Sequence, residues 1–209
     1  MQTLRERQTD LSVIIPVYNL EHYIQPMLHS LQAQETGDYT TEILFVLNNC
    51  TDRSEDVIRE SGLKCKILYC DRQGCGCARN TALDVATGEF VWFMDGDDWL
   101  LSSMAIRTAL DKVKGLDIIR IPFKSDRYLY GYFSMVWQYV MRYDFIKEFR
   151  FPDYQPSEDD QYMKNVLNKA GFNPYTYMSL PRVVRPLYYY NYLREGSNMY
   201  RFTVLGEQI

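Results

Sequence analysis

Long hydrophobic runs are missing from this chain of 209 residues. Its longest unbroken apolar stretches, residues 43–47 and 90–94, fall far short of the roughly 20 residues that cross a bilayer as a helix. The charged N-terminal residues are not followed by an apolar segment long enough for a secretory signal. We therefore expect a cytoplasmic protein without a transmembrane segment, peripheral at most on the inner face of a membrane.

An excess of basic residues is missing as well. The 23 lysines and arginines are outnumbered by 27 aspartates and glutamates, which gives a net charge of −4 and argues against a nucleic-acid partner. The 5 cysteines all fall between Cys50 and Cys77, without the paired two-residue gaps of structural zinc sites. An odd, clustered set of cysteines is also not the disulfide framework of a secreted protein.

The segments that are present predict an α/β fold, because short apolar segments alternate with segments of helical spacing. In the first half we expect strands at 11–17, 43–47, 66–70 and 90–94, with helices at 21–34, 52–61 and 78–86. In the second half we expect helices at 102–114 and 157–170 and strands at 117–123 and 183–192. Residues 133–146 form either a helix or an irregular mixture of strand and helix. This order predicts a mainly parallel central sheet flanked by helices.

Ligands of such sheets bind beyond the carboxyl ends of the strands. That edge gathers residues 16–19, 48–52 and 95–98, which follow three different strands. The last segment carries three aspartates, whose mutual repulsion favours a bound cation. Mg²⁺ and Mn²⁺ prefer oxygen ligands and often bind one or two carboxylates together with substrate phosphates. An ordinary Asp/Gly turn is the alternative interpretation of the same residues.

A second acidic group, Glu158, Asp159 and Asp160, follows Ser157. A serine N-cap with acidic residues in the first turn is ordinary helix chemistry, which alone accounts for these residues. A carboxylate at such a position could also serve as a general base toward a hydroxyl group.

Two arginines, one shortly after a loop and one within a loop, have two interpretations each. Arg79 follows the glycine-containing loop 74–76 and could bind a phosphate or a carboxylate, or form a surface ion pair. Arg194 lies in the polar segment 194–198, which is either a loop that closes over a charged ligand or an exposed turn. The chain has 18 tyrosines and 3 tryptophans. Residues of these types more often belong to the core than to a binding site, although their flat faces also suit sugar rings.

Taken in order, these segments resemble family 2 glycosyltransferases of the GT-A fold, which are inverting and use nucleotide-sugar donors. The matching segments are SVIIPVYN, EILFVLNNCTD, DRQGCGCARNTALDVATGEFVWFMDGDDWL, WQYVMRYDFIKEFRFPD with SEDDQYMKNVL, and PLYYYNYLREGSN. The resemblance implies one GT-A domain over residues 1–209, with a nucleotide-binding half at about 10–100 and an aromatic-rich acceptor-side half at about 101–209. It also implies a metal-dependent transfer, with Mn²⁺ or Mg²⁺, to a saccharide or glycolipid acceptor in polysaccharide or glycolipid assembly.

The resemblance assigns roles by position. Asp159 would be the catalytic base, and Glu158 would help to position the acceptor. Asp97 would ligate the metal at the donor diphosphate, and Trp137 would lie near the acceptor. The donor-binding positions would be Pro16, Tyr18, Asn48, Asp71, Arg79, Asn80, Asp95, Arg194 and Ser197.

Departures from the family pattern leave two other functions open. Many members carry Asp-Asp-Gly-Ser where this chain has Leu47 to Cys50, so the amide of Asn48 replaces the acidic group expected to bind uracil. A UDP-sugar is still the donor that the resemblance favours. A non-catalytic nucleotide- or sugar-binding protein on an altered transferase scaffold is one alternative. A sugar nucleotidyltransferase is the other, but it needs a lysine-bearing glycine loop where this chain has 16–19.

Overall fold

The structure, a computed structural model, describes residues 9–125, 135–153, 158–172 and 180–191. Its elements are β1 (Thr9–Val17), α1 (Gln25–Gln32), β2 (Thr41–Asn48), α2 (Ser54–Glu60), β3 (Lys66–Cys70), α3 (Cys75–Leu83), β4 (Gly88–Phe93), β5 (Trp99–Leu100), α4 (Ala105–Val113), β6 (Ile118–Arg120), β7 (Phe123–Ser125), the 3₁₀ helix η1 (Val136–Gln138), β8 (Tyr139–Arg142), α5 (Tyr143–Ile146), α6 (Glu158–Lys169) and β9 (Tyr188–Tyr190). No helix in these ranges has the length and apolar character that crossing a membrane requires.

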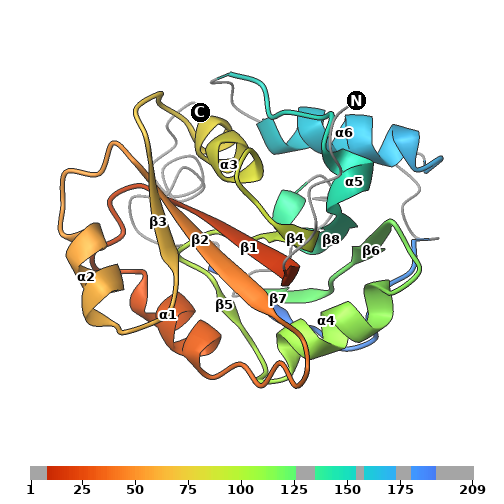
Figure 1. Ribbon diagram of the computed structural model, residues 1–209, viewed down its shortest axis with the longest axis horizontal. Coiled ribbons are helices and arrows are strands. Elements are labelled where there is room, and N and C mark those ends of the chain that lie inside the picture. Colours follow the sequence, from red (N-terminus) through yellow and green to blue (C-terminus); the bar gives the residue numbers. More distant parts are fainter. Residues whose placement is uncertain (1–8, 126–134, 154–157, 173–179, 192–209) are drawn as a thin grey trace.

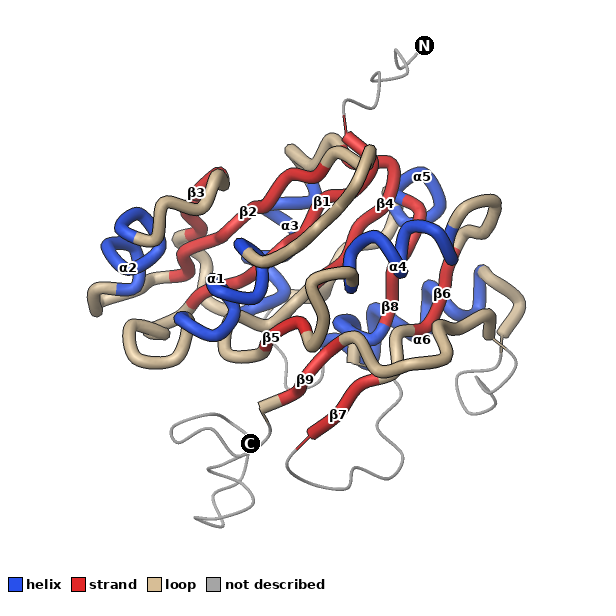
Figure 2. Tube along the Cα trace, turned by 90° about the horizontal axis from the view of Figure 1, so that it is seen from below, coloured by secondary structure: helices blue, strands red, loops and turns tan. Residues whose placement is uncertain are grey.

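A six-stranded sheet in the order β3-β2-β1-β4-β8-β6 forms the centre of the molecule (Figure 1). The strands β3, β2, β1 and β4 are parallel, and β8 pairs antiparallel with both β4 and β6. The predicted mainly parallel sheet is therefore confirmed. A smaller sheet, in the order β5-β9-β7, lies beside it (Figure 2).

Helices cover both faces of the large sheet, which explains why β1 is apolar without alternation. Val13 and Ile15 face the layer of α1 and α4, whereas Ile14 faces the layer of α3 and α6, and all three side chains are fully buried. Burial of each such side chain is worth about 1.5–3 kcal/mol. The strands with the clearest apolar pattern in the sequence, β1, β2 and β4, are thus the ones whose carboxyl ends form the edge of the predicted site.

Several predicted boundaries differ from the structure in the first half. The third helix begins at Cys75 rather than 78 because Gly74, at φ 119°, adopts a backbone conformation that permits the turn directly before it. Gly88 does not end that helix but opens β4. The helix expected at 52–61 begins at Ser54, with Arg53 as its N-cap, and the side chain of Asp52 accepts the Ser54 amide.

The second half departs further from the prediction. The strand expected at 117–123 is divided between β6 and β7, which belong to different sheets, and Pro122 between them has no amide to donate. Of the strand expected at 183–192, the described residues 183–191 contain only β9. Of the two alternatives for 133–146, the mixture of strand and helix is confirmed over the described residues 135–146, which contain η1, β8 and α5.

A buried carboxylate, Glu42, joins β1, β2 and β4 at the ends opposite the predicted site. Its Oε1 accepts hydrogen bonds from the Ser12 hydroxyl at 2.6 Å and from the Thr87 amide at 2.6 Å. Its Oε2 accepts one from Lys66 Nζ at 2.8 Å. Burial opposes ionisation, but these hydrogen bonds outweigh it and hold the pKa of Glu42 below its ordinary value.

We predict that Glu42→Gln lowers the free energy of unfolding by about 1–2 kcal/mol at pH 7, because charge-assisted bonds become neutral ones and an amide faces Lys66. Since the folded-state pKa is depressed, the advantage of the wild type is present above pH 4.5 and disappears as pH falls through the folded pKa. Urea unfolding at pH 7 and pH 3 measures both effects. The exposed Glu60→Gln is the control, and an equal loss in both variants would refute the role of burial.

Candidate active site

Three loops meet beyond the carboxyl ends of β1, β2 and β4. The Asn19 side chain accepts the Thr51 amide at 2.8 Å, which fastens the β1 loop to the β2 loop. A Cβ on Gly96 would lie 2.7 Å from Leu20 Cδ1 and 3.4 Å from the Pro16 carbonyl, so the third loop packs directly on the first. The predicted convergence of 16–19, 48–52 and 95–98 is confirmed. Because Gly96 has no side chain, the two loops can make this contact.

Arg79, on α3, brings together the two acidic groups that the sequence separates. Its Nη2 donates to Asp95 Oδ1 at 2.9 Å, and its Nη1 donates to Glu158 Oε1 at 3.0 Å and to Asp159 Oδ1 at 2.6 Å. The Arg79 side chain is 3% exposed, whereas those of Asp95 and Asp159 are 28% and 13% exposed. A buried cation thus holds three carboxylates whose side chains are more exposed than its own.

The charges in this cluster do not balance. One guanidinium faces three carboxylates, so the cluster carries an excess of negative charge if all three are ionised. Burial raises the pKa of Asp159 to about 7; Arg79 lowers it, and the negative charges of Glu158 and Asp95 raise it again. Asp159 Oδ2 accepts the Val136 amide at 3.1 Å, which fixes the orientation of the carboxyl group.

Asp98 has a different environment from the other aspartates of its loop. It is fully buried, its Oδ2 accepts the Tyr188 hydroxyl at 2.6 Å, and its Oδ1 accepts the Asn191 amide at 2.8 Å. Burial and the neighbouring charges of Asp97 and Asp95 raise the pKa of Asp98 well above its ordinary value. Asp98 is therefore a structural residue of the loop, inaccessible to a ligand.

Two asparagines predicted to bind the donor are engaged with the protein itself. The Asn48 side chain donates to the Cys70 and Arg72 carbonyls at 2.9 and 2.6 Å and accepts the Gly74 amide at 2.9 Å. The Asn80 side chain donates to the Phe151 carbonyl and accepts the Phe151 amide, each at 2.9 Å. Both residues shape the walls of the site by fixing neighbouring backbone segments.

A cavity of about 240 Å³ opens beside Asn48, at the carboxyl ends of β2 and β3. Asn49, Asp52, Tyr69 and Asp71 are among its lining residues. The cavity does not include the Arg79 cluster, so the edge of the sheet offers two adjacent regions, one hollow and one highly charged. Asp71, a predicted donor-binding residue, lies in the hollow region.

The other predicted residues have varied positions. Pro16 lies in β1, and Tyr18 comes directly after this strand with 56% of its surface exposed. Asp97 lies in the loop after β4. Trp137 is 1% exposed, with the rings of Tyr188 and Tyr190 stacked against it. Arg194 and Ser197 lie outside the described residues.

Two residues of the site were not predicted from the sequence: Tyr188, which donates to Asp98, and Val136, which donates to Asp159. Their contacts are made by a tyrosine in a tyrosine-rich segment and by a backbone amide, and neither carries a local signal. The one signal in the sequence was the number of aspartates in 95–98, since a third carboxylate, that of Asp98, exceeds the one or two that a metal commonly binds.

Comparisons with known proteins agree with this geometry. A family model described as "Glycosyl transferase family 2" matches residues 12–174, more than half of the chain. The chain is 34% identical over 108 residues to the putative glycosyltransferase EpsH of Bacillus subtilis, covering 49% of this chain and 31% of that protein. It is 38% identical over 93 residues to the poly(ribitol-phosphate) beta-N-acetylglucosaminyltransferase TarS of Staphylococcus aureus, covering 43% of this chain and 16% of that protein. The chain thus spans about a third or less of these relatives.

Solved structures show the same fold. TarS residues 1–349 in complex with UDP-GlcNAc superpose with a TM-score of 0.78 at 23% identity, covering 92% of this chain and 61% of that one. The mannosyltransferase PcManGT of Pyrobaculum calidifontis in complex with GDP-Man and Mn²⁺ gives a TM-score of 0.69 at 19% identity, covering 93% and 60%. The predicted GT-A fold is confirmed.

We predict that Arg79→Met lowers the free energy of unfolding by about 3–5 kcal/mol at pH 8, since it leaves three carboxylates without their shared partner. The loss should shrink at pH 5, because the pKa of Asp159 is raised to about 7 and this carboxylate is then protonated. Arg59→Met removes an exposed pair with Glu55 and serves as the control. Denaturant titration of both variants makes the comparison, and equal stabilities would contradict the structural role of Arg79.

Proposed function

Because this chain belongs to glycosyl transferase family 2, we propose that it is an inverting transferase that moves a sugar from a nucleotide-sugar to an acceptor hydroxyl. The observation that carries the proposal is the contact of Arg79 with Asp95 on one side and Asp159 on the other. Asp95, the proposed donor-side acid, and Asp159, the candidate base, therefore both contact the same guanidinium, although 64 positions separate them in the chain.

Asp159 is the proposed catalytic base. It would take the proton of the acceptor hydroxyl while that oxygen forms a bond to the anomeric carbon and the bond to the diphosphate breaks, so that configuration inverts. A base acts best when its pKa lies near the working pH, and burial raises the pKa of Asp159 to about 7. The Val136 amide and Arg79 hold the carboxylate, and Glu158 beside it would help to position the acceptor.

A divalent cation fits the donor side of this site. Within the described ranges no three His, Cys, Asp or Glu side chains gather closely enough to hold a metal alone. Mg²⁺ and Mn²⁺ commonly bind one or two carboxylates together with substrate phosphates, and the negative excess around Arg79 favours such an ion. Asp97 would hold the metal, with Asp95 facing the donor, and the bound ion would offset charge on the leaving diphosphate.

The cavity beside Asn48 is the proposed place of the nucleoside. Its lining by Asn49 and Asp71 offers hydrogen-bonding groups for a base and ribose, and Tyr18 and Pro16 border the same edge. A UDP-sugar is the proposed donor, supported by the TarS complex with UDP-GlcNAc. Asn48 and Asn80 would act indirectly, through the backbone segments that they fix.

The acceptor side is proposed to take a saccharide or glycolipid, as in polysaccharide assembly. The relative TarS, named for action on poly(ribitol-phosphate), supports a polymeric acceptor that carries hydroxyl groups. Such an acceptor would place the protein in the cytoplasm or on the inner face of a membrane. We also propose that residues 1–209 act as one domain, because β6 and β8 of the second half complete the sheet of the first. Arg194 and Ser197 would contact the diphosphate, and Trp137 would support the acceptor wall from behind.

We predict that Asp159→Asn lowers kcat by roughly 10²–10⁴-fold while the Kd for UDP with Mn²⁺ changes less than about threefold, because the base is lost and the donor groups stay. Turnover of UDP-sugars with Mn²⁺ and calorimetric titration measure the two effects.

Asp160→Asn is the matched control, since Asp160 lies in the same helical turn but pairs with Lys164. Near-normal turnover by Asp159→Asn would show that another group takes the proton. Pyrophosphate-dependent exchange in the wild type would instead indicate a nucleotidyltransferase.

We predict that kcat/KM falls about tenfold per pH unit below pH 7, since a base with a raised pKa is protonated there. Glu158→Gln removes one of the negative charges that raise this pKa and should move the break in the profile to lower pH. A profile that is flat from pH 5 to 8 in the wild type would contradict the assignment of Asp159.

A further inference from the structure

The hydroxyl of Tyr188 joins two parts of the loop 95–98. It donates to the buried Asp98 Oδ2 at 2.6 Å and accepts the Asp95 amide at 2.9 Å. Tyr188 is fully buried, and burial with the neighbouring charges of Asp98 and Asp95 raises its pKa well above the ordinary value, so the hydroxyl keeps its proton. One side chain from β9 thus fixes both ends of the segment that carries Asp97.

Asn191, directly after β9, adds two contacts with the same loop. Its amide donates to Asp98 Oδ1 at 2.8 Å, and its side-chain Nδ2 donates to the Asp97 carbonyl at 3.3 Å. Tyr188 and Asn191 together therefore contact Asp95, Asp97 and Asp98. These contacts hold a loop of like charges whose repulsion would otherwise favour other conformations.

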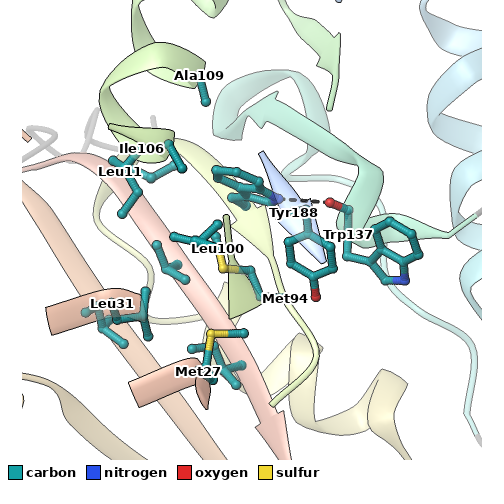
Figure 3. Packing of buried hydrophobic residues seen from close by; sticks show 14 of the residues in the cluster. Leu11, Met27, Leu31, Met94, Leu100, Ile106, Ala109, Trp137 and Tyr188 are labelled. Carbon is teal, nitrogen blue, oxygen red and sulfur yellow. Dashed lines mark hydrogen bonds between the residues drawn. The ribbon is translucent and has the colours of Figure 1, made fainter. Parts of the chain in front are cut away.

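The ring of Tyr188 reaches the opposite wall of the site. It stacks on Trp137 with centroids 4.9 Å apart and planes 13° apart. Figure 3 shows the two rings side by side. Trp137 is anchored through its carbonyl, which accepts Trp92 Nε1 at 2.9 Å. The residue before it, Val136, donates its amide to Asp159. Tyr188 therefore contacts the donor loop through its hydroxyl and the segment that orients the base through its ring.

We propose that Tyr188 is a positioning residue, which holds the 95–98 loop in the geometry that binds the metal-nucleotide and aligns this loop with the wall that orients Asp159. The inference rests on the proposed function and adds a residue to the donor site that does not itself touch the donor. The loop and the base belong to different parts of the chain, and a rigid aromatic ring between them limits their relative movement.

Another tyrosine supplies a matched comparison. Tyr162, on α6, is also fully buried and stacks on Phe151 at 3.9 Å, but its hydroxyl has no hydrogen-bond partner in the described part of the chain. Removing the hydroxyl of Tyr162 therefore deletes no positioning contact. The two Tyr→Phe variants differ in the hydrogen bonds lost and not in burial or ring stacking.

The test compares Tyr188→Phe with Tyr162→Phe in the full chain. We expect Tyr188→Phe to raise the Kd for UDP with Mn²⁺, and the KM for the donor, by at least tenfold, with the KM for the acceptor little changed. Tyr162→Phe should leave all three constants within about twofold. A purely structural role would lower the melting temperature of Tyr188→Phe without moving Kd or KM well below that temperature, and this result would overturn the proposal.

A second variant covers failure of Tyr188→Phe to fold. Asn191→Ala removes the side-chain contact with the Asp97 carbonyl and should raise the same Kd by about threefold, whereas an unchanged Kd would overturn the proposal. Failure of the proposed function has a different signature. A wild type that binds UDP with Mn²⁺ but transfers no sugar would refute the transferase, while the Kd comparison would still test Tyr188.

Discussion

The structure depends on one buried guanidinium. Arg79 projects from α3 between the loop after β4 and the start of α6, and it donates to a carboxylate on each side. Without this cation the same carboxylates would repel each other in a place where water screens them poorly. The ion cluster therefore joins the two halves of the fold, and it holds together the acids to which we assign the proposed metal-nucleotide and proton-accepting roles.

Charge and burial give chemically similar residues different tasks here. Asp95, Asp97 and Asp98 are near neighbours, yet Asp98 is sealed under Tyr188 while Asp95 keeps access to solvent. The position of Asn48 and Asn80 in the family pattern would assign both to the ligand. Their side chains instead form hydrogen bonds with the backbone of neighbouring segments. Motif positions thus identify the region of the site, and the surrounding contacts decide which members touch the substrate.

The sequence predicts the first half of the fold well because β1, β2 and β4 are covered on both faces, so their apolar runs are explicit. The rule that ligands bind at the carboxyl ends of parallel strands then predicts where the loops meet. The second half is predicted less well, since β6, β7 and β9 have only three residues each and form through distant partners. The contact of Tyr188 with Asp95 spans 93 positions, and no local pattern encodes it.

The most direct test of the central claim is a crystal structure of the protein with Mn²⁺ and a non-hydrolysable UDP-sugar. The account predicts the ion on Asp97, the nucleoside in the cavity lined by Asn49 and Asp71, and the anomeric carbon between the diphosphate and the Asp159 carboxylate. A nucleotide bound away from the carboxyl ends of β1, β2 and β4, or a sugar that points away from Asp159, would contradict it.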